Sequence, residues 1–209
     1  MLRTLLVSLG LIGAAGVAAS LLTEGFEVWT AEGARRLAVI ERPVPAPFAV
    51  LAGPGLSGRS LPKVLSGDGH VTLVDFVYTG CPSVCLTLGS SFQQLQRALT
   101  ATAAEDVRLL SISFDPAHDG AAQLATYAAQ WRADSRLWRV ATVPDALQLQ
   151  GLLGAFQVTV IADGQGGYAH NAGLLVIDQQ GRLVRIFDAD APEAALTYAR
   201  SLLWRGPAT

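Results

Sequence analysis

Short runs of apolar, β-branched and aromatic residues alternate along this chain with segments whose apolar residues recur at helical spacing. VTLVDFVY (71–78) and VRLLSISF (107–114) are almost wholly apolar, which is typical of strands buried on both faces of a sheet. Between them, residues 83–101 place apolar side chains on one helical face: Val84, Leu88, Phe92, Leu95 and Leu99. Strand, helix and strand in this order predict a right-handed βαβ unit with parallel strands.

The alternation of strands and helices continues through the second half of the chain. A turn leads into a helix for which Asp119 is the expected N-cap. A strand at 137–142 and a helix that Pro144 can open follow. AGLLVID and RLVRIF then flank a QQG turn in which Gly181 suits a positive φ, as in a β-hairpin. A final amphipathic helix at about 191–204 completes a predicted α/β domain with a central mixed sheet flanked by helices.

The first 22 residues do not fit this core. No residue from Leu5 to Leu22 is charged, and such a helix extends about 27 Å, close to the roughly 30 Å of a bilayer's hydrocarbon. Arg3 precedes the run and acidic residues follow it, so the positive-inside rule keeps the N-terminus in the cytoplasm. The sequence therefore predicts a single transmembrane helix in the cytoplasmic membrane, with the soluble domain in the periplasm or another extracytoplasmic space. The small residues of GVAAS (16–20) also suit a cleaved signal peptide, which exports the domain as well.

Prolines mark the segment between this apolar run and the domain. Pro43, Pro45 and Pro47 remove backbone donors and favour an extended spacer. The predicted organisation is, in order, an anchor or signal peptide, a tether, one folded domain and a tail: 1–22, 23–47, 48–204 and 205–209. The chain has 209 residues with 15 basic and 17 acidic side chains scattered along it, and its net charge of −2 speaks against nucleic acid as a partner.

Both cysteines lie in TGCPSVC, where the first buried strand meets its helix. Open α/β sheets bind ligands at such junctions, and the N-terminus of a helix stabilises a thiolate and lowers its pKa. Residues four apart in a helix have Cα atoms roughly 6 Å apart, so Cys81 and Cys85 can form a disulfide or bind one metal ion together. A space-filling role is the less favoured alternative, because the two cysteines fall four apart in an exported domain. With this motif after the first central strand, the order of elements predicts a thioredoxin-like fold.

The pair of thiolates also indicates which metal fits. Thiolates favour a soft ion, and a histidine as third ligand suits copper better than structural zinc, which usually takes four protein ligands. His70 precedes a strand and is expected on a solvated turn. His118 in FDPAHD and His170 in GGYAHNAG both lie near strand ends, and spacing alone does not decide between them.

Four segments in this order resemble the Sco/SenC family of copper-binding, thioredoxin-like proteins: VDFVYTGCPSVC, ISFDPAHD, YAAQWRADSRLWRVAT and GGYAHNAGLLVIDQQGRLVRIFD. The similarity extends over about residues 48–190. It implies that Cys81, Cys85 and His170 bind a copper ion, Cu(I) or Cu(II). It also implies that the partner is the copper-centre subunit of cytochrome c oxidase.

Other positions depart from the family or match it without supplying a ligand. Many relatives have an acidic residue where this chain has Ser83 and a proline where it has Leu86, which concerns partner recognition and redox tuning. Asp115 and Asp119 match the family's DP loop and are interpreted mainly as turn and cap residues, with a supporting role behind the ligands as the alternative.

Two functions are compatible with these residues. The first is a membrane-tethered copper metallochaperone for assembly of the binuclear copper centre of cytochrome c oxidase, with a thiol reductant or another copper chaperone as further partners. The second is a thiol-disulfide oxidoreductase in which Cys81 and Cys85 form a redox pair that reduces a partner's cysteines. Replacing His170 separates them, because only the first needs the imidazole. A thiol peroxidase is a weaker alternative, because nothing in the sequence marks a peroxide pocket.

Overall fold

The computed structural model describes residues 2–22, 30–81, 84–102 and 106–203. The chain divides into two compact units, Met1–Ala38 and Val39–Thr209, and each is described by itself. The expected tail at 205–209 lies outside the described residues.

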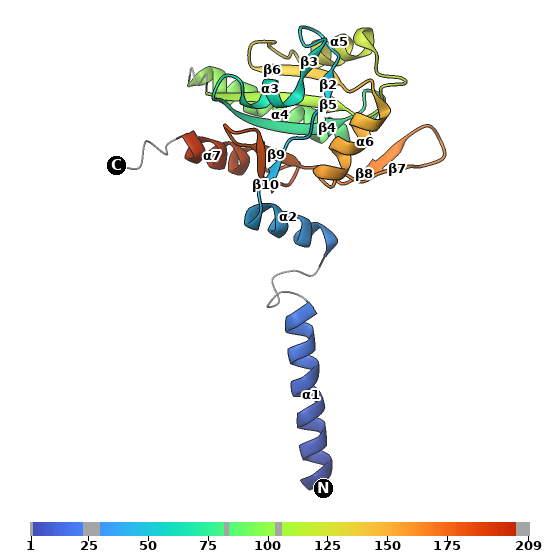
Figure 1. The fold of residues 1–209 in the computed structure, drawn as a ribbon, viewed down its shortest axis with the longest axis vertical. Helices are drawn as coiled ribbons and strands as arrows, with labels where there is room; N and C mark the ends of the chain where they lie inside the picture. Colours follow the sequence, from blue (N-terminus) through green and yellow to red (C-terminus); the bar gives the residue numbers. More distant parts are fainter. Residues whose placement is uncertain (1, 23–29, 82–83, 103–105, 204–209) are drawn as a thin grey trace. The chain divides into compact units, whose positions relative to one another are not determined.

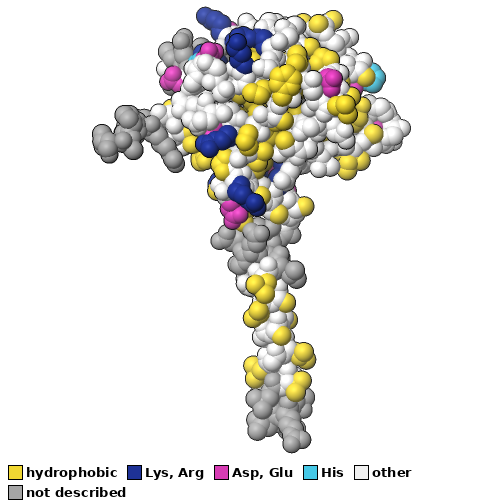
Figure 2. All heavy atoms as spheres, viewed as in Figure 1, with side chains coloured by type: hydrophobic (Ala, Val, Ile, Leu, Met, Phe, Trp, Pro, Cys, Tyr) yellow, Lys and Arg dark blue, Asp and Glu magenta, His cyan; other side chains and the backbone are white. Residues whose placement is uncertain are grey.

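The N-terminal unit contains helix α1 (Leu2–Leu22), which coincides with the predicted anchor. Large apolar side chains are exposed along it (Figure 2): Val7, Leu9, Leu11, Ile12, Val17 and Leu21. Within the described ranges, however, no helix is both long and apolar enough to cross a membrane, so the predicted transmembrane helix is not found there.

A second helix, α2 (Ala31–Glu41), occupies part of the predicted tether. The hydroxyl of Thr30 accepts a hydrogen bond from the Gly33 N–H (3.0 Å) and so satisfies a free donor in the first turn. Glu32 pairs with Arg35 and Arg36, both at 2.9 Å, one turn along the helix. The segment 23–47 is thus partly helical, because these local contacts stabilise a turn-by-turn hydrogen-bonded structure that its prolines, all later in the sequence, do not interrupt.

The second unit is built on one six-stranded mixed sheet in the order β1-β10-β9-β4-β5-β6 (Figure 1). Its strands are β1 (Val44–Pro45), β4 (Val71–Val77), β5 (Val107–Ser113), β6 (Trp138–Thr142), β9 (Leu174–Ile177) and β10 (Arg182–Phe187). Strands β4, β5 and β6 are parallel, and β9, β10 and β1 add to them by antiparallel pairing. This is the central mixed sheet that the sequence predicts.

The edge strand β1 shows that the sheet starts earlier in the chain than expected. Val44 pairs with Leu183 and Pro45 with Arg182, so the sheet begins before residue 48, where the sequence places the domain boundary. A proline fits here because an edge strand needs ladder hydrogen bonds on one side only.

Helices cover both faces of the sheet. They are α3 (Leu61–Ser66), α4 (Val84–Ala101), α5 (Ala121–Gln130), α6 (Ala146–Ala155) and α7 (Pro192–Leu203). All seven residues of β4 are buried, as expected for a central strand covered on both sides. On one face the Phe76 ring meets Phe156 at the end of α6, and on the other Phe92 of α4 packs against Trp138.

Two small hairpins complete the domain, β2 (Val50–Leu51) with β3 (Arg59–Ser60) and β7 (Val160–Ala162) with β8 (Tyr168–His170). In Figure 1 the β7–β8 hairpin (orange) projects from the rim of the domain beside α6. The sequence did not predict it.

The predicted hairpin between β9 and β10 is confirmed. Gly181 has φ +75°, and its N–H donates to the Asp178 carbonyl at 2.9 Å, as the turn requires.

Candidate metal centre

The two cysteines lie where the sequence places them, after the C-terminal end of β4. Cys81 follows the turn at Thr79 and Gly80, just after β4 ends at Val77, and Cys85 lies in the first turn of α4. Both are free thiols, 9% and 3% exposed, and the Cys85 N–H donates a hydrogen bond to Cys81 Sγ (3.3 Å). Pro82 and Ser83 of the motif, including the departure at Ser83, lie outside the described residues.

His170 comes to the cysteines from the β7–β8 hairpin, where it pairs with Val160. Its Nε2 lies 3.9 Å from Cys85 Sγ. Sulfur and nitrogen ligands of one zinc ion have bond lengths that sum to roughly 4.3 Å, so these two atoms are close enough to share an ion. His170 Nδ1 is buried and has no hydrogen-bond partner among the described residues. The ring is therefore held by packing, with its polar edge directed at a thiol.

The Phe114 ring packs against this imidazole, and two tyrosine rings pack against Phe114. The Phe114 ring centre lies 5.1 Å from that of His170, and Tyr168 packs edge-on against both Phe114 and Tyr78. The Tyr168 N–H donates to the Tyr78 hydroxyl at 3.3 Å, which ties the hairpin to the end of β4. Sequence reasoning missed this cluster, although Tyr78 and Phe114 stand at the ends of the two buried strands, where a signal was available.

Burial sets the protonation of the two facing groups. Burial first, and the neighbouring Cys81 thiol second, raise the pKa of Cys85 far above its ordinary value. Burial lowers the pKa of the His170 imidazole. Both groups are therefore neutral at pH 7. The expectation of lowered thiol pKa values is wrong for Cys85, because desolvation outweighs the helix N-terminus.

Asp119 fixes the loop that carries Cys81. Its carboxylate accepts hydrogen bonds from the Thr79 N–H (2.9 Å), the Thr79 hydroxyl and the Ser113 hydroxyl, and the residue is 2% exposed. The expected helix cap is wrong, because these donors occupy the carboxylate and Gly120 is the N-cap of α5. Asp119 thus joins the cysteine loop to the end of β5.

The other two histidines lie away from the thiols. His118 is on the rim, as expected, but its side chain is 78% exposed and its Nδ1 lies 2.8 Å from the Asp115 carboxylate. His70 precedes β4, about 23 Å of strand away from the cysteine loop. The structure thus brings His170, and not His118, to Cys85. In the described part of the chain, no three or more His, Cys, Asp or Glu side chains already form a group that could hold a metal ion.

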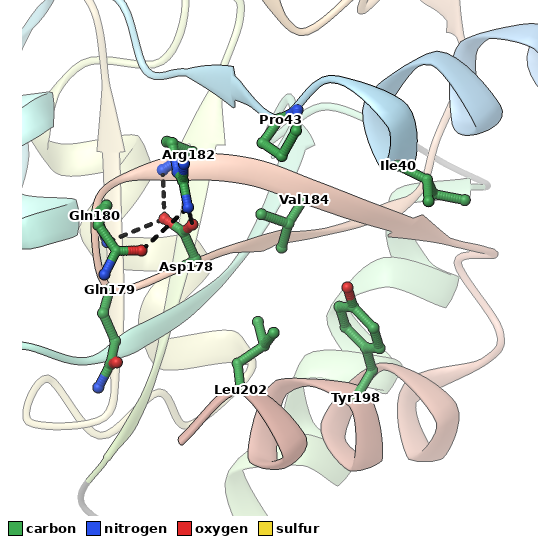
Figure 3. A pocket seen from close by; sticks show the side chains of 9 residues that line it. All are labelled: Ile40, Pro43, Asp178, Gln179, Gln180, Arg182, Val184, Tyr198 and Leu202. Carbon is green, nitrogen blue, oxygen red and sulfur yellow. Dashed lines mark hydrogen bonds and ion pairs between the residues drawn. The ribbon is translucent and has the colours of Figure 1, made fainter. Parts of the chain in front are cut away.

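The volumes of the surface hollows do not distinguish the cysteine site from other places on the domain. A hollow of about 430 Å³ adjoins it, lined by Tyr78, Thr79, Gly80, His118 and Tyr168 among others. A second one of about 430 Å³ lies between β10 and α7, where Val184 faces Leu202 and Tyr198 (Figure 3). It adjoins the β9–β10 turn, at the opposite end of the sheet from the cysteines, and neither cysteine nor histidine is among its described lining residues.

Comparison with known proteins agrees with this geometry. A sequence profile of the SCO1/SenC family matches residues 65–202, more than half of the chain. The chain belongs to the SCO1/SenC family. This SCO1/SenC member is 26% identical over 122 residues to a SCO1 protein homolog of Bacillus subtilis (strain 168). The match covers 57% of this chain and 63% of the relative, which is less than two thirds of the relative's length.

Solved structures share the fold of this SCO1/SenC member. A SCO1/SenC family lipoprotein from Bacillus anthracis gives a TM-score of 0.69 at 20% identity, over 78% of this chain and 99% of that one. Bradyrhizobium japonicum ScoI, solved with copper bound, gives 0.61 at 22% identity over 76% and 99%. BsSco, in which a disulfide switch is described and which is a member of the Sco family of cytochrome c oxidase assembly proteins, gives 0.67 at 21% over 79% and 96%. These similarities establish the thioredoxin-like Sco fold.

Proposed function

We propose that this chain is a copper metallochaperone that holds its cargo with Cys81, Cys85 and His170. The observation that carries the proposal is the approach of His170 Nε2 to Cys85 Sγ at 3.9 Å, from segments 85 residues apart in the chain. The family membership and the copper-bound ScoI structure support the choice of copper. Two thiolates and an imidazole also suit a soft ion such as copper better than structural zinc, which usually takes four protein ligands.

Each of the three residues would have its own role in binding copper. Cys81 Sγ accepts a hydrogen bond from the Cys85 backbone N–H, which keeps the Cys81 thiol next to the residue that His170 approaches, so Cys81 would be the third ligand of the site. Each thiol gives up its proton to bind, whereas His170 is already neutral. Oxidation of the pair to a disulfide removes two ligands at once, so the redox state of the thiols controls release.

Anaerobic Cu(I) titration of the reduced chain tests this proposal. The wild type should bind one copper per chain, and Cys81→Ser or Cys85→Ser should remove that binding. His170→Ala should weaken it, whereas His118→Ala is the matched control, because His118 lies on the same rim but pairs with Asp115. Equal effects of the two histidine replacements would contradict the proposed ligand set, and copper binding that survives loss of both cysteines would refute it.

The oxidoreductase reading has its own support. Two adjacent free thiols, linked by the Cys85 N–H donated to Cys81 Sγ, form a dithiol that can reduce a partner's disulfide. A disulfide switch is described for the similar BsSco. Assaying His170→Ala for both activities separates the readings: a metallochaperone loses copper retention and keeps disulfide reduction. Loss of neither activity would favour the oxidoreductase.

The finer part of the proposal concerns place and partner. We expect the domain to work outside the cytoplasmic membrane, because the uncharged N-terminal segment directs export and a similar protein is described as a lipoprotein. We expect the copper-centre subunit of cytochrome c oxidase as the recipient, with a thiol reductant or a second copper chaperone upstream. Cell fractionation combined with N-terminal sequencing of the purified protein shows whether the segment is retained as a membrane tether or cleaved; recovery in the cytoplasm would contradict this part.

A further inference from the structure

Asp115 and His118 form a side-chain pair in the turn between β5 and α5. His118 Nδ1 lies 2.8 Å from Asp115 Oδ2 and 2.9 Å from Oδ1. The His118 and Asp119 N–H groups hold the turn, because both donate to the Asp115 carbonyl, at 3.2 and 2.8 Å. The Tyr168 hydroxyl also interacts with the Asp115 carboxylate. Since a carboxylate only accepts hydrogen bonds, the pairing requires that Nδ1 of His118 carries a proton.

This pairing is the one that metal-binding histidines normally have. Such a histidine almost always donates its other ring N–H to a carboxylate, a carbonyl or water, which fixes the ring and makes the ligating nitrogen more basic. With Nδ1 held by Asp115 and the His118 side chain 78% exposed, Nε2 is the nitrogen available to a partner. Among the described residues, however, no group of three or more His, Cys, Asp or Glu could hold an ion here. His118 can therefore bind copper only together with ligands that arrive with the ion.

His118 also lies close to the way in to the cysteines. It lines the hollow of about 430 Å³ that Gly80 and Tyr168 line as well. Gly80 directly precedes Cys81, and Tyr168 lies two residues before His170 on the same strand, β8. The hollow thus adjoins both segments that carry the proposed ligands, while none of the three ligands is among its described lining residues.

The proposed ligands are themselves sheltered. Cys81 is 9% and Cys85 3% exposed, and the Phe114 ring packs against His170. Copper that reaches the domain bound to another molecule must exchange its ligands one after another, because it is never released as a free ion. An exposed imidazole beside the cysteine loop can take part in this exchange before both thiols can.

We infer that His118 is an entry ligand, which accepts Cu(I) from a weaker Cu(I) complex and passes it to Cys81 and Cys85. In the first step a bond from copper to one ligand of that complex breaks, and a bond to His118 Nε2 forms. In the second step each thiol loses its proton to water, both sulfurs bind the ion, and the bond to Nε2 breaks. Copper remains Cu(I), so the transfer needs neither oxidant nor reductant. The inference rests on the proposed function and leaves its final ligand set unchanged.

The rate of copper loading tests this role. Reduced chain is mixed by stopped flow with the coloured Cu(I)–bicinchoninate complex under argon, and the loss of colour is followed. His118→Ala should load roughly tenfold more slowly than the wild type, the scale of effect seen when support of a metal ligand is lost. Its final copper content and equilibrium affinity should equal those of the wild type. His70→Ala is the matched control and should load at the wild-type rate, because His70 precedes β4 at the other end of the strand from the cysteines.

Two further measurements separate a ligand from a merely structural residue. Imidazole added to the solution should restore fast loading to His118→Ala, because it supplies the missing nitrogen, and should leave His70→Ala unchanged. In ¹⁵N NMR of the histidine-labelled, copper-free wild type at pH 8, the His118 ring should carry its proton on Nδ1, and Asp115→Ala should weaken that preference. A proton on Nε2 at pH 8 would leave no lone pair for copper and would overturn the inference.

Failure of this inference is distinguishable from failure of the proposed function. If wild type and His118→Ala load at the same rate and both reach one copper per chain, His118 is not an entry ligand and the metallochaperone stands. If the wild type takes up no copper at all, the proposed function is refuted, and the entry ligand with it. Circular dichroism checks the fold of each variant, and the NMR measurement on the wild type needs no replacement of His118.

Discussion

Asp75, which is fully buried in the middle of strand β4, should make the stability of the domain depend on pH, and Asp75→Asn should remove that dependence. Burial raises the pKa of the Asp75 carboxyl group from 3.8 to about 7 in the folded chain, although a hydrogen bond with the Ser111 side chain acts in the opposite direction. Each unit corresponds to roughly 1.4 kcal/mol, so the shift amounts to about 4 kcal/mol. Because the folded pKa lies above the unfolded one, folding is favoured when the carboxyl group is protonated. The full contribution is present below about pH 4 and is lost as the pH rises through 7.

Urea unfolding followed by circular dichroism at several pH values between 4 and 8 measures this effect. Relative to Asp75→Asn, the free energy of unfolding of the wild type should fall by about 4 kcal/mol from pH 4 to pH 8. The buried amide of the variant has its own cost, but that cost does not change with pH, so the slope is the readout. Burial lowers the pKa of His170, which reduces stability below pH 6.5 equally in both proteins and cancels in the difference. Parallel curves for the two proteins would refute the reasoning.

Two other replacements test the scaffold of the site. Asp119→Asn should destabilise the domain by about 1–3 kcal/mol and weaken copper binding, because one amide oxygen cannot replace both carboxylate oxygens as acceptor for Thr79. Thermal unfolding measures the first effect and Cu(I) titration the second. Unchanged copper affinity would show that copper binding does not depend on the hydrogen bonds between Asp119 and Thr79. Gly89→Ala should cost about 1–3 kcal/mol in urea unfolding, because its Cβ would overlap the Trp131 ring. Gly151→Ala in α6, with open space at its Cβ, is the control and should be neutral or stabilising; equal losses in both glycine variants would contradict the packing argument.

The sheet and its main helices were predictable because their sequence signals are strong. The runs that form β4 and β5 are apolar throughout, and the helix between them repeats its apolar residues at helical spacing, so local pattern and tertiary burial agree. The β9–β10 turn was predictable for a different reason. Gly181 supplies a backbone conformation that other residues adopt with strain.

The parts that could not be predicted depend on pairing between distant segments. Strands β7 and β8 have three residues each and are joined by a glycine-rich turn, so TVIADGQGGYAH has the local signal of a loop. The family resemblance implies His170, but spacing alone could not choose between His118 and His170, because only the pairing of that hairpin brings one imidazole to Cys85. Asp119 has the sequence position of a helix cap, and no local pattern shows that Thr79, 40 residues earlier, occupies its carboxylate.

The thiols and the imidazole are held by different parts of the fold. Cys81 and Cys85 follow β4, which is hydrogen-bonded to a strand on each side, whereas His170 belongs to the β7–β8 hairpin, whose described strand pairing is internal and which the Tyr168 N–H ties to the Tyr78 hydroxyl. Under the proposed function, moving this hairpin away would break the Tyr168–Tyr78 hydrogen bond and remove one copper ligand, while the hydrogen bonds of the main sheet stayed intact. Under that function, copper release would need no unfolding of the main sheet.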